Sequence, residues 1–308
     1  MNITLETRQN CDIIFIDIRN VYAVILRNGQ DRSLHCYCCN ITLCYTEEIM
    51  LLTADVGNTN IKFGVYDGDR LKFKLRVSTD TTKTSDEFAV ELYTFFQIYG
   101  ISASSIDSSI ISSVVPKITS PLSTAVKTVT GVESIVIGAG IKSGLNIKID
   151  NPERLGADIV AGCVAAYEKY GGPFVMIFMG TATVITYVDE NKTYLGGAIA
   201  PGVGVSLDAL TSKGALLSSV DLKVPERVIS TNTNDCIRSG IMFGTACMLD
   251  GMIDRFFEQT GKSCRVIATG GFAPLMVQNC RHEIIYDENI ILDGLNCIYK
   301  KNRGNCNY

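Results

Sequence analysis

The residues best suited to chemistry stand in one polar turn between two apolar runs. Residues 51–54 are apolar, the apolar pattern resumes at Ile61, and residues 55–60 between them read Asp-Val-Gly-Asn-Thr-Asn, with Lys62 close behind. Such a turn can aim backbone N–H groups, amides and a hydroxyl at one point, while Lys62 adds positive charge and Asp55 offers an oxygen ligand to a hydrated cation. The implied ligand is a nucleotide phosphate with magnesium. The alternative is an ordinary hairpin whose turn residues satisfy only their own backbone.

Asp158 is the second candidate. Asn151 can cap a helix and Pro152 suits its first position, so the pattern predicts a helix from there toward Tyr170. The residues three, four and seven positions after Asp158 are small: Ala161, Gly162 and Ala165. A face with so little bulk lets another helix or a substrate come close. Two interpretations stay open, a general base and a solvated helix carboxylate beside a tight helix contact.

A second hairpin repeats the layout of the first. The apolar residues 174–177 lead into Gly180-Thr181-Ala182-Thr183, a returning strand over residues 184–188 and an acidic turn. The chain therefore looks internally duplicated, with a phosphate-type hairpin opening each half.

The elements between the hairpins predict an α/β fold. Thr84 begins a capping-type sequence before an apolar series of helical spacing, residues 106–115 predict a strand, residues 122–129 a helix, and residues 134–137 a strand. In the second half a glycine-rich segment, residues 196–202, is followed by a helix after Asn232, and later by a strand ending in Thr269-Gly270-Gly271, where a flat ligand could approach the backbone.

Composition excludes several classes of protein. The chain has 308 residues, 46% hydrophobic and 19% charged, enough for a sizeable core and about two domains. Its 28 Lys+Arg against 32 Asp+Glu give no overall attraction for nucleic acid or an anionic membrane. The charge-free stretch Gly171–Val188 approaches transmembrane length, but its glycines and β-branched alternation favour a buried hairpin. No secretory signal is evident, so the cytoplasm is the expected location.

Residues 1–49 differ in character from the rest of the chain. They hold five of the twelve cysteines, including Cys36, Cys38, Cys39 and Cys44, beside His35. One tight cluster is a poor zinc site because structural zinc usually takes two separated ligand pairs. A disordered or loosely attached extension is the favoured interpretation, with the first functional domain over residues 50–171 and the second over residues 172–308.

Several motifs, present together and in order, resemble those of type III pantothenate kinases over about residues 50–302. They are Asp55-x-Gly57-Asn58-Thr59, Gly156-Ala157-Asp158, Gly180-Thr181-Ala182-Thr183, Gly197-Ala198-Ile199-Ala200-Pro201-Gly202, Asn232-Thr233 with Ser239-Gly240, and Thr269-Gly270-Gly271. The resemblance implies the actin-like, ribonuclease-H-like duplicated α/β fold, with ATP in the cleft between the halves. It also implies a homodimer that builds the pantothenate pocket near the subunit interface.

The resemblance carries roles over to matching positions. The expected ATP site is Asp55, Val56, Gly57, Asn58, Thr59, Asn60, Ile61, Lys62 and Thr181, with Asp55 as the magnesium carboxylate. The expected substrate residues are Gly156, Ala157, Asp158, Ile159 and Thr233, with Asp158 as the base that takes the proton from the pantothenate hydroxyl. In-line phosphoryl transfer needs these residue types and no histidine.

Three positions depart from the family pattern. Ile149 stands where many members have Tyr, and Ile159 where many have Arg. Phe178 stands where the family places an Asp that binds a monovalent cation such as potassium or ammonium, and a phenyl ring offers no oxygen ligand. Two functions therefore stay open: an ATP-dependent kinase making 4′-phosphopantothenate, the first step toward coenzyme A, and a binding or regulatory relative that has lost turnover.

Overall fold

The computed structural model describes residues 49–138, 140–213 and 220–303, together with the backbone of five strands within residues 2–44. The chain divides into two compact units, Met1–Ile49 and Met50–Tyr308. The division falls directly before the first strand of the first phosphate-type hairpin.

The described backbone of the first unit forms five strands in two small sheets. β1 (Asn2–Arg8), β2 (Cys11–Ile18) and β3 (Val21–Asn28) form an antiparallel sheet, and β4 (Ser33–Cys36) pairs with β5 (Ile41–Cys44). Its described backbone is regular strand, so disorder, one of the two expectations for this segment, is not found in these strands, while its loose attachment stays a prediction. The side chains of the cysteine cluster, predicted to be a poor zinc site, lie outside the described residues.

The second unit opens with a five-stranded sheet in the order β10-β9-β6-β7-β8. β6 (Met50–Val56), β7 (Asn60–Asp67) and β8 (Arg70–Ser78) form an antiparallel meander, while β9 (Ser108–Ser113) runs parallel to β6 and β10 (Ser134–Val136) parallel to β9. Helix α1 (Ser85–Tyr99) and helix α2 (Pro116–Thr130) connect these strands.

The second sheet repeats this order. β12 (Phe174–Met179), β13 (Ala182–Val188) and β14 (Thr193–Pro201) form the meander, β15 (Arg265–Thr269) runs parallel to β12, and β16 (Ile284–Tyr286) runs parallel to β15. The short β11 (Asn146–Ile147) adds an edge next to β14. The connecting helices are α4 (Val203–Lys213), α5 (Thr233–Thr260) and α6 (Ala273–Val277). The predicted duplicated α/β fold is confirmed.

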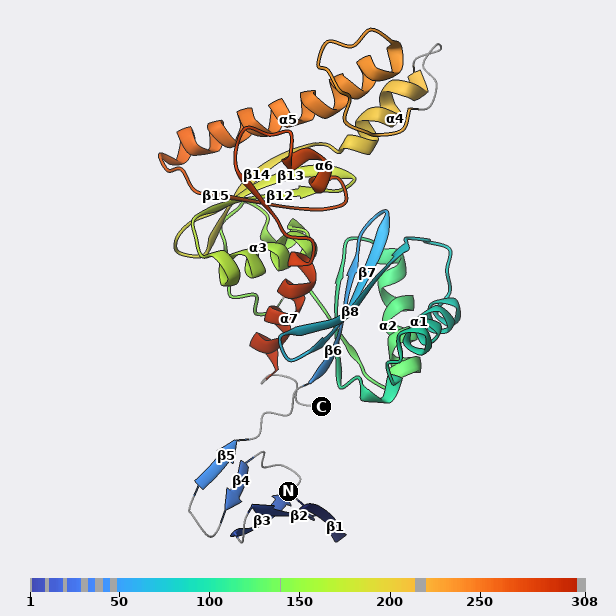
Figure 1. Ribbon diagram of the computed structural model, residues 1–308, viewed down its shortest axis with the longest axis vertical. Coiled ribbons are helices and arrows are strands. Elements are labelled where there is room, and N and C mark those ends of the chain that lie inside the picture. Colours follow the sequence, from blue (N-terminus) through green and yellow to red (C-terminus); the bar gives the residue numbers. More distant parts are fainter. Residues whose placement is uncertain are drawn as a thin grey trace. The chain divides into compact units, whose positions relative to one another are not determined.

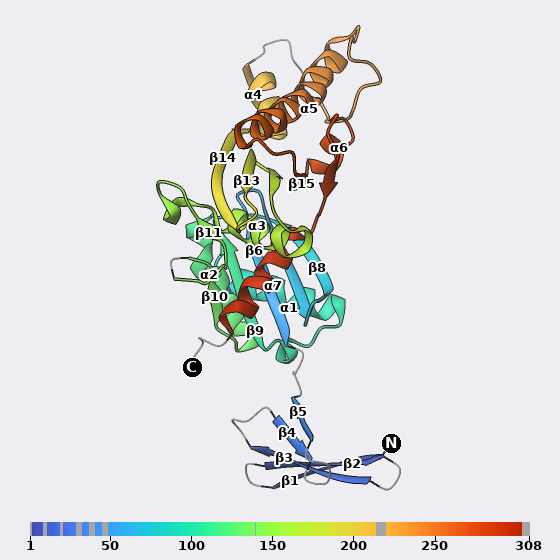
Figure 2. The same cartoon turned by 90° about the vertical axis from the view of Figure 1, so that its left-hand side faces the viewer.

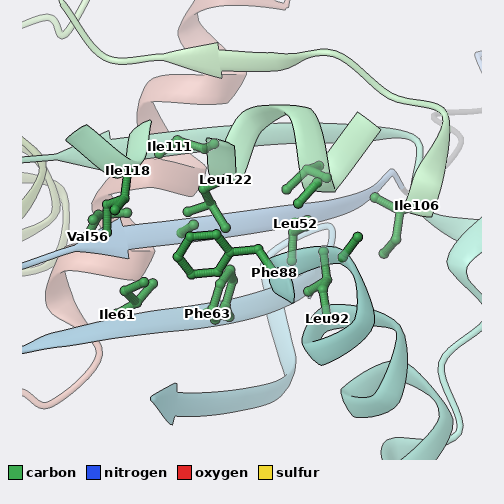
Figure 3. Close-up of a cluster of buried hydrophobic side chains, with 14 of the residues drawn as sticks. Leu52, Val56, Ile61, Phe63, Phe88, Leu92, Ile106, Ile111, Ile118 and Leu122 are labelled. Atoms are coloured by element: carbon green, nitrogen blue, oxygen red, sulfur yellow. The ribbon is translucent and has the colours of Figure 1, made fainter. Parts of the chain in front are cut away.

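Each sheet has helices on both faces (Figures 1 and 2). In the first half α1 and α2 cover one face of the sheet. The apolar side chains of β6, β7 and β9 pack against the apolar side chains of these two helices around Phe88 (Figure 3). Alternate residues of the strands point there because side chains alternate between the faces of a strand. Residues such as Asp55 and Lys62 consequently face the opposite side.

That opposite side is occupied by two helices packed on each other, α3 (Ala157–Tyr170) and α7 (Ile290–Asn302). The crossing is tight, since a Cβ added at Gly294 would overlap the carbonyl oxygen of Ala161. Helix α7, although last in the chain, packs on β6, β7 and β9 of the first sheet. The boundary predicted at residues 171/172 falls between α3 and β12.

Helix starts agree with the sequence in two cases, α1 and α5, and differ in two; at α5, Asn232 accepts a hydrogen bond from the Asp235 N–H as the N-cap. Thr84 forms the expected capping box with Glu87 at the start of α1. The helix expected to begin at Pro152 is instead a short 3₁₀ turn, Pro152–Arg154, followed by a break, and α3 starts after Gly156. Asn151 makes no side-chain cap. Helix α2 starts at Pro116, earlier than residue 122, because the ring of Pro116 fits the first helical turn.

Among the described helices, α5 alone is long and apolar enough to cross a membrane by length and composition. Its most apolar window is 44% buried, and Met242, Leu249 and Ile253 belong to the core that covers the second sheet. A core helix of this kind passes the same test, so its length carries no argument for a membrane.

Candidate active site

The two hairpin turns meet. The hydroxyl oxygens of Thr59 and Thr181 lie 3.1 Å apart and share a hydrogen bond across 122 positions of sequence. Both turns line a cavity of about 530 Å³ whose wall also includes the start of α3, the start of α4 and Gly270-Gly271. The residues predicted from two separate motifs therefore form one site.

The first turn is held by its own backbone and by Thr79, the residue directly after β8. Gly57 N–H donates to the Asn60 carbonyl at 3.0 Å, and the Thr79 hydroxyl donates to the Gly57 carbonyl at 2.6 Å. The predicted ATP residues that line the cavity are Asp55, Gly57, Asn58, Thr59, Asn60, Lys62 and Thr181. Val56 and Ile61 do not line it, because their side chains are buried in the core of the first half.

The second turn is built by close backbone approaches. Gly180 N–H donates to the Ala182 carbonyl, and Gly202 N–H to the Thr181 carbonyl, both at 3.0 Å. A side chain at Gly202 would collide with the carbonyls of Gly180 and Thr181. Gly270 has φ of +109° and lies against the backbone of Met179, a position that requires glycine. These glycines bring β14 and β15 up against the turn.

Asp55 is the buried charge of the site, with 6% of its surface exposed. Strand register places it between Lys62 on β7 and Ser112 on β9. Its Oδ1 has no hydrogen-bond partner among the described residues. Burial, and then the nearby Asp158 carboxylate, raise the pKa of Asp55 to about 7, while Lys62 lowers it.

Asp158 lies in the first turn of α3, where its Oδ1 accepts a hydrogen bond from the Ile159 N–H at 2.9 Å. A Cβ at Gly156 would meet this carboxylate oxygen, so the glycine leaves room for it. Burial raises the pKa of Asp158. The structure therefore places two carboxylates from different motifs in the wall of one cavity, close enough for Asp158 to raise the pKa of Asp55.

The small-residue face of α3 serves packing rather than substrate approach. Ala161 receives Gly294 of α7, and Gly162 receives the Phe178 ring, whose edge lies 2.6 Å from where a Cβ at Gly162 would stand. The expected tight helix contact is present beside Asp158, yet Asp158 itself also lines the cavity. The tight helix contact is thus present next to Asp158, and the role of Asp158 as a general base stays a prediction.

The site fits a divalent cation. Asp55 offers a buried oxygen without a partner among the described residues, and its carboxylate and that of Asp158 repel each other. A bound cation would give the buried Asp55 oxygen a partner and would also reduce the repulsion between the two carboxylates. Asp55 is the residue that would hold magnesium with the nucleotide phosphates.

The site does not fit the monovalent cation expected from the family. Phe178 is 7% exposed and fills the space over Gly162 with carbon. Its neighbour in register, Thr269, has a buried hydroxyl with no hydrogen-bond partner among the described residues. One hydroxyl without a carboxylate is a weak ligand set for potassium or ammonium.

The predicted substrate residues are not all at the cavity. Gly156, Asp158 and Ile159 line it, while Ala157 does not. Thr233 is exposed at the start of α5, after its N-cap Asn232, and is not part of the cavity wall. Its substrate role stays a prediction, tied to the expected subunit interface.

Sequence reasoning missed three residues of the site. Ser112 stands beside Asp55, and Arg76 and Asp208 line the cavity. In the sequence, Ser112 reads only as part of the polar end of a strand. Ser112 could be found only from the register of the parallel strands β6 and β9, which places it beside Asp55. A single sequence does not reveal this register, because the two strands are far apart in the chain.

Comparison with known proteins decides the family. Residues 51–255 match the model of a family described as type III pantothenate kinase. The chain is 39% identical over 254 residues to a type III pantothenate kinase of an Exiguobacterium species, and 41% identical to one of a Roseiflexus species. Each alignment covers 82% of this chain and the whole of the relative. The chain belongs to the type III pantothenate kinase family.

Solved structures share the fold of this family member at low identity. A Campylobacter jejuni protein described as belonging to a Baf family of transcriptional activators aligns with a TM-score of 0.51 and 19% identity, covering 82% of this chain and 99% of that one. A Sinorhizobium meliloti protein described as a 2-dehydro-3-deoxygalactonokinase aligns with a TM-score of 0.51 and 11% identity, covering 82% and 96%. At such identities only the fold is shared.

Proposed function

We propose that this chain transfers the γ-phosphoryl group of ATP to the primary hydroxyl of pantothenate, the first step of coenzyme A biosynthesis. The observation that carries the proposal is the meeting of the two hairpin turns, Thr59 against Thr181, in a cavity that also contains Asp55 and Asp158. Family membership supplies the substrates, and the cavity supplies the residue types that phosphoryl transfer requires.

The phosphate donors come from both turns. Asn58, Thr59 and Thr181 line the cavity and offer backbone N–H groups, an amide and hydroxyls as donors, and Lys62 adds a positive charge. Donors that are fixed in place before the reaction stabilise charge on the transferred group without reorganising. When magnesium is bound at Asp55, it neutralises phosphate charge.

Asp158 is the proposed acceptor of the pantothenate hydroxyl proton. Its carboxylate is anchored at the start of α3 by the Ile159 N–H, which fixes its direction. A second oxygen stays available to orient the attacking hydroxyl and take its proton. Gly156 and Ile159 on either side would contact the substrate near the reacting end.

The rest of the pantothenate site is proposed to need a second copy of the chain. Thr233 stands away from the cavity wall of its own chain, as expected if it contacts a substrate bound near a subunit interface. The proposal therefore includes a homodimer and a cytoplasmic location, both taken from the family.

One observation favours a second function. Phe178 replaces the cation-binding carboxylate with a buried ring, which is the change expected in a relative that binds nucleotide but turns over poorly. Such a protein would act by binding or regulation.

The deciding experiment is phosphorylation of pantothenate by the purified full chain with magnesium and ATP, with and without added potassium or ammonium. Formation of 4′-phosphopantothenate supports the kinase. ATP binding without any turnover under all of these conditions would refute it in favour of the second function.

A further inference from the structure

A second cavity of about 410 Å³ adjoins the larger one and shares four wall residues with it: Lys62, Arg76, Gly270 and Gly271. Its other walls come from β8, the end of β16 and the start of α7, including Lys74, Tyr286 and Asn289. The two cavities are thus neighbouring compartments of one space, and neither Thr59 nor Thr181 of the hairpin turns lines the second.

Two cations face this space from neighbouring strands. Lys62 on β7 and Arg76 on β8 are direct partners in the antiparallel register, so their side chains leave the sheet on the same face. Lys74, two positions before Arg76, points the same way but is already paired with Glu288.

Neither Lys62 nor Arg76 makes an ion pair with any of the described residues. Lys62 also lies opposite Asp55 of β6 in the strand register, but no ion pair joins the two side chains, and Asp55 is the residue that would hold magnesium. Like charges directly opposite each other destabilise a sheet. Lys62 and Arg76 therefore form a pair of positive charges without an ion-pair partner among the described residues, and an anionic ligand would stabilise this pair.

The surroundings favour phosphate as that anion. A guanidinium fork matches phosphate oxygens in a bidentate manner, and an ammonium adds a point charge. A Cβ built on Gly271 would meet nothing within 4 Å, so the backbone there is open to a ligand. Asn289 contributes an amide, and Tyr286, 38% exposed, a phenol.

We propose that Lys62 and Arg76 form a second phosphate subsite, at the junction of the two cavities. The phosphate belongs either to the nucleotide tail or to a separate phosphorylated compound bound beside it. Only the first of these sources rests on the proposed kinase function.

The test uses inorganic pyrophosphate as the probe and isothermal titration calorimetry on the full chain, without pantothenate. Arg76→Gln should weaken pyrophosphate binding by about tenfold or more, as expected for the loss of one charge-assisted contact. The control is Arg70→Gln, which changes an arginine on the same strand that lines neither cavity. It should bind pyrophosphate as the unmodified chain does.

A second readout separates ligand binding from a structural role. Without ligand, Arg76→Gln should unfold at the same temperature as the unmodified chain or slightly higher, because the substitution removes a like-charge contact on an exposed edge strand. A structural role would lower that temperature instead, and would count against the subsite.

A competition experiment identifies the source of the phosphate. If a non-hydrolysable ATP analogue excludes pyrophosphate, the subsite holds the nucleotide tail. If Arg76-dependent binding persists with the analogue bound, the subsite serves a separate compound.

The proposal is overturned if Arg76→Gln binds pyrophosphate normally, or if Arg70→Gln loses binding equally. If the chain fails to phosphorylate pantothenate but its pyrophosphate binding depends on Arg76, the proposed kinase function is refuted and the proposed subsite is supported.

Discussion

Asp55 and Phe178 occupy equivalent positions in the two halves of the second unit. Each stands two residues before the glycine of its turn, and each has a buried hydroxyl beside it on the parallel strand, Ser112 or Thr269. One position carries a buried charge that needs a cation, and the other a ring that fills space. The repeated fold therefore supports two different chemistries at matched places.

Asp158→Asn tests the proton acceptor. The amide keeps the size of the side chain but cannot accept the proton, so turnover should fall by at least about a hundredfold. ATP binding, measured by calorimetry, should change little. Because burial raises the pKa of Asp158, the ionised form that accepts a proton is lost as pH falls through that pKa, and the rate of the unmodified chain should fall with it.

The matched control is Asp86→Asn, which alters a first-turn carboxylate of α1 outside both cavities. Its turnover should equal that of the unmodified chain. Near-normal turnover of Asp158→Asn would remove Asp158 from the mechanism.

Phe178→Asp tests the missing cation site. The unmodified chain should be nearly indifferent to potassium, and the substitution should introduce a response, because it sets a carboxylate beside the unpartnered Thr269 hydroxyl. Loss of the ring also leaves a void over Gly162, which should lower the free energy of unfolding by about 3 kcal/mol or more. Rates are therefore best measured well below the unfolding temperature.

Phe178→Asn is the control for charge, since it makes the same void without a carboxylate and should gain no potassium response. Strong potassium dependence of the unmodified chain would mean that other oxygens form the site.

At the scale of elements, local patterns were predictable and long-range register was not. The two hairpins and the cap of α1 depend on residues close in sequence, and all were predicted. The start of α3 was misplaced because Asn151 and Pro152 carry start signals that lead only into a 3₁₀ turn. Ser112 and Arg76 were missed because their places at the site depend on pairing between strands.

Gly294→Ala tests the crossing of α3 and α7. The added methyl group would overlap the Ala161 carbonyl, so the helices must separate. Overpacking of this kind should lower the free energy of unfolding by about 1–3 kcal/mol or more, measured by chemical denaturation.

Gly251→Ala is the matched control, because it also lies inside a helix, α5, but a Cβ there meets nothing within 4 Å. It should stabilise the chain by up to about 1 kcal/mol through helix propensity alone. Equal effects of the two substitutions would contradict the tight crossing.

At the scale of the whole molecule, the site belongs entirely to the unit Met50–Tyr308. The curated relatives align over 254 residues, and residues 1–49 have no counterpart in the repeated half. A chain consisting of residues 50–308 should therefore be soluble, and as active and thermally stable as the full chain. Insolubility, or zinc that co-purifies in stoichiometric amount with the full chain and is lost with residues 1–49, would contradict this expectation.

Helix α7 has a consequence for how the protein is made. It is the last helix of the chain, yet it completes the first sheet: Tyr66 donates to Asp293 at 2.5 Å, Asn296 donates to the Gly68 carbonyl at 3.0 Å, and Tyr299 and Ser108 share a hydrogen bond of 2.6 Å. A ribosome adding about 5–20 residues per second releases β6 on the order of 10–50 s before α7. During that interval the cleft-side face of the first sheet has no α7 to cover it. The first half therefore cannot complete its packing until the last helix has been synthesised, and in that interval its cleft-side face is open to aggregation and chaperone binding.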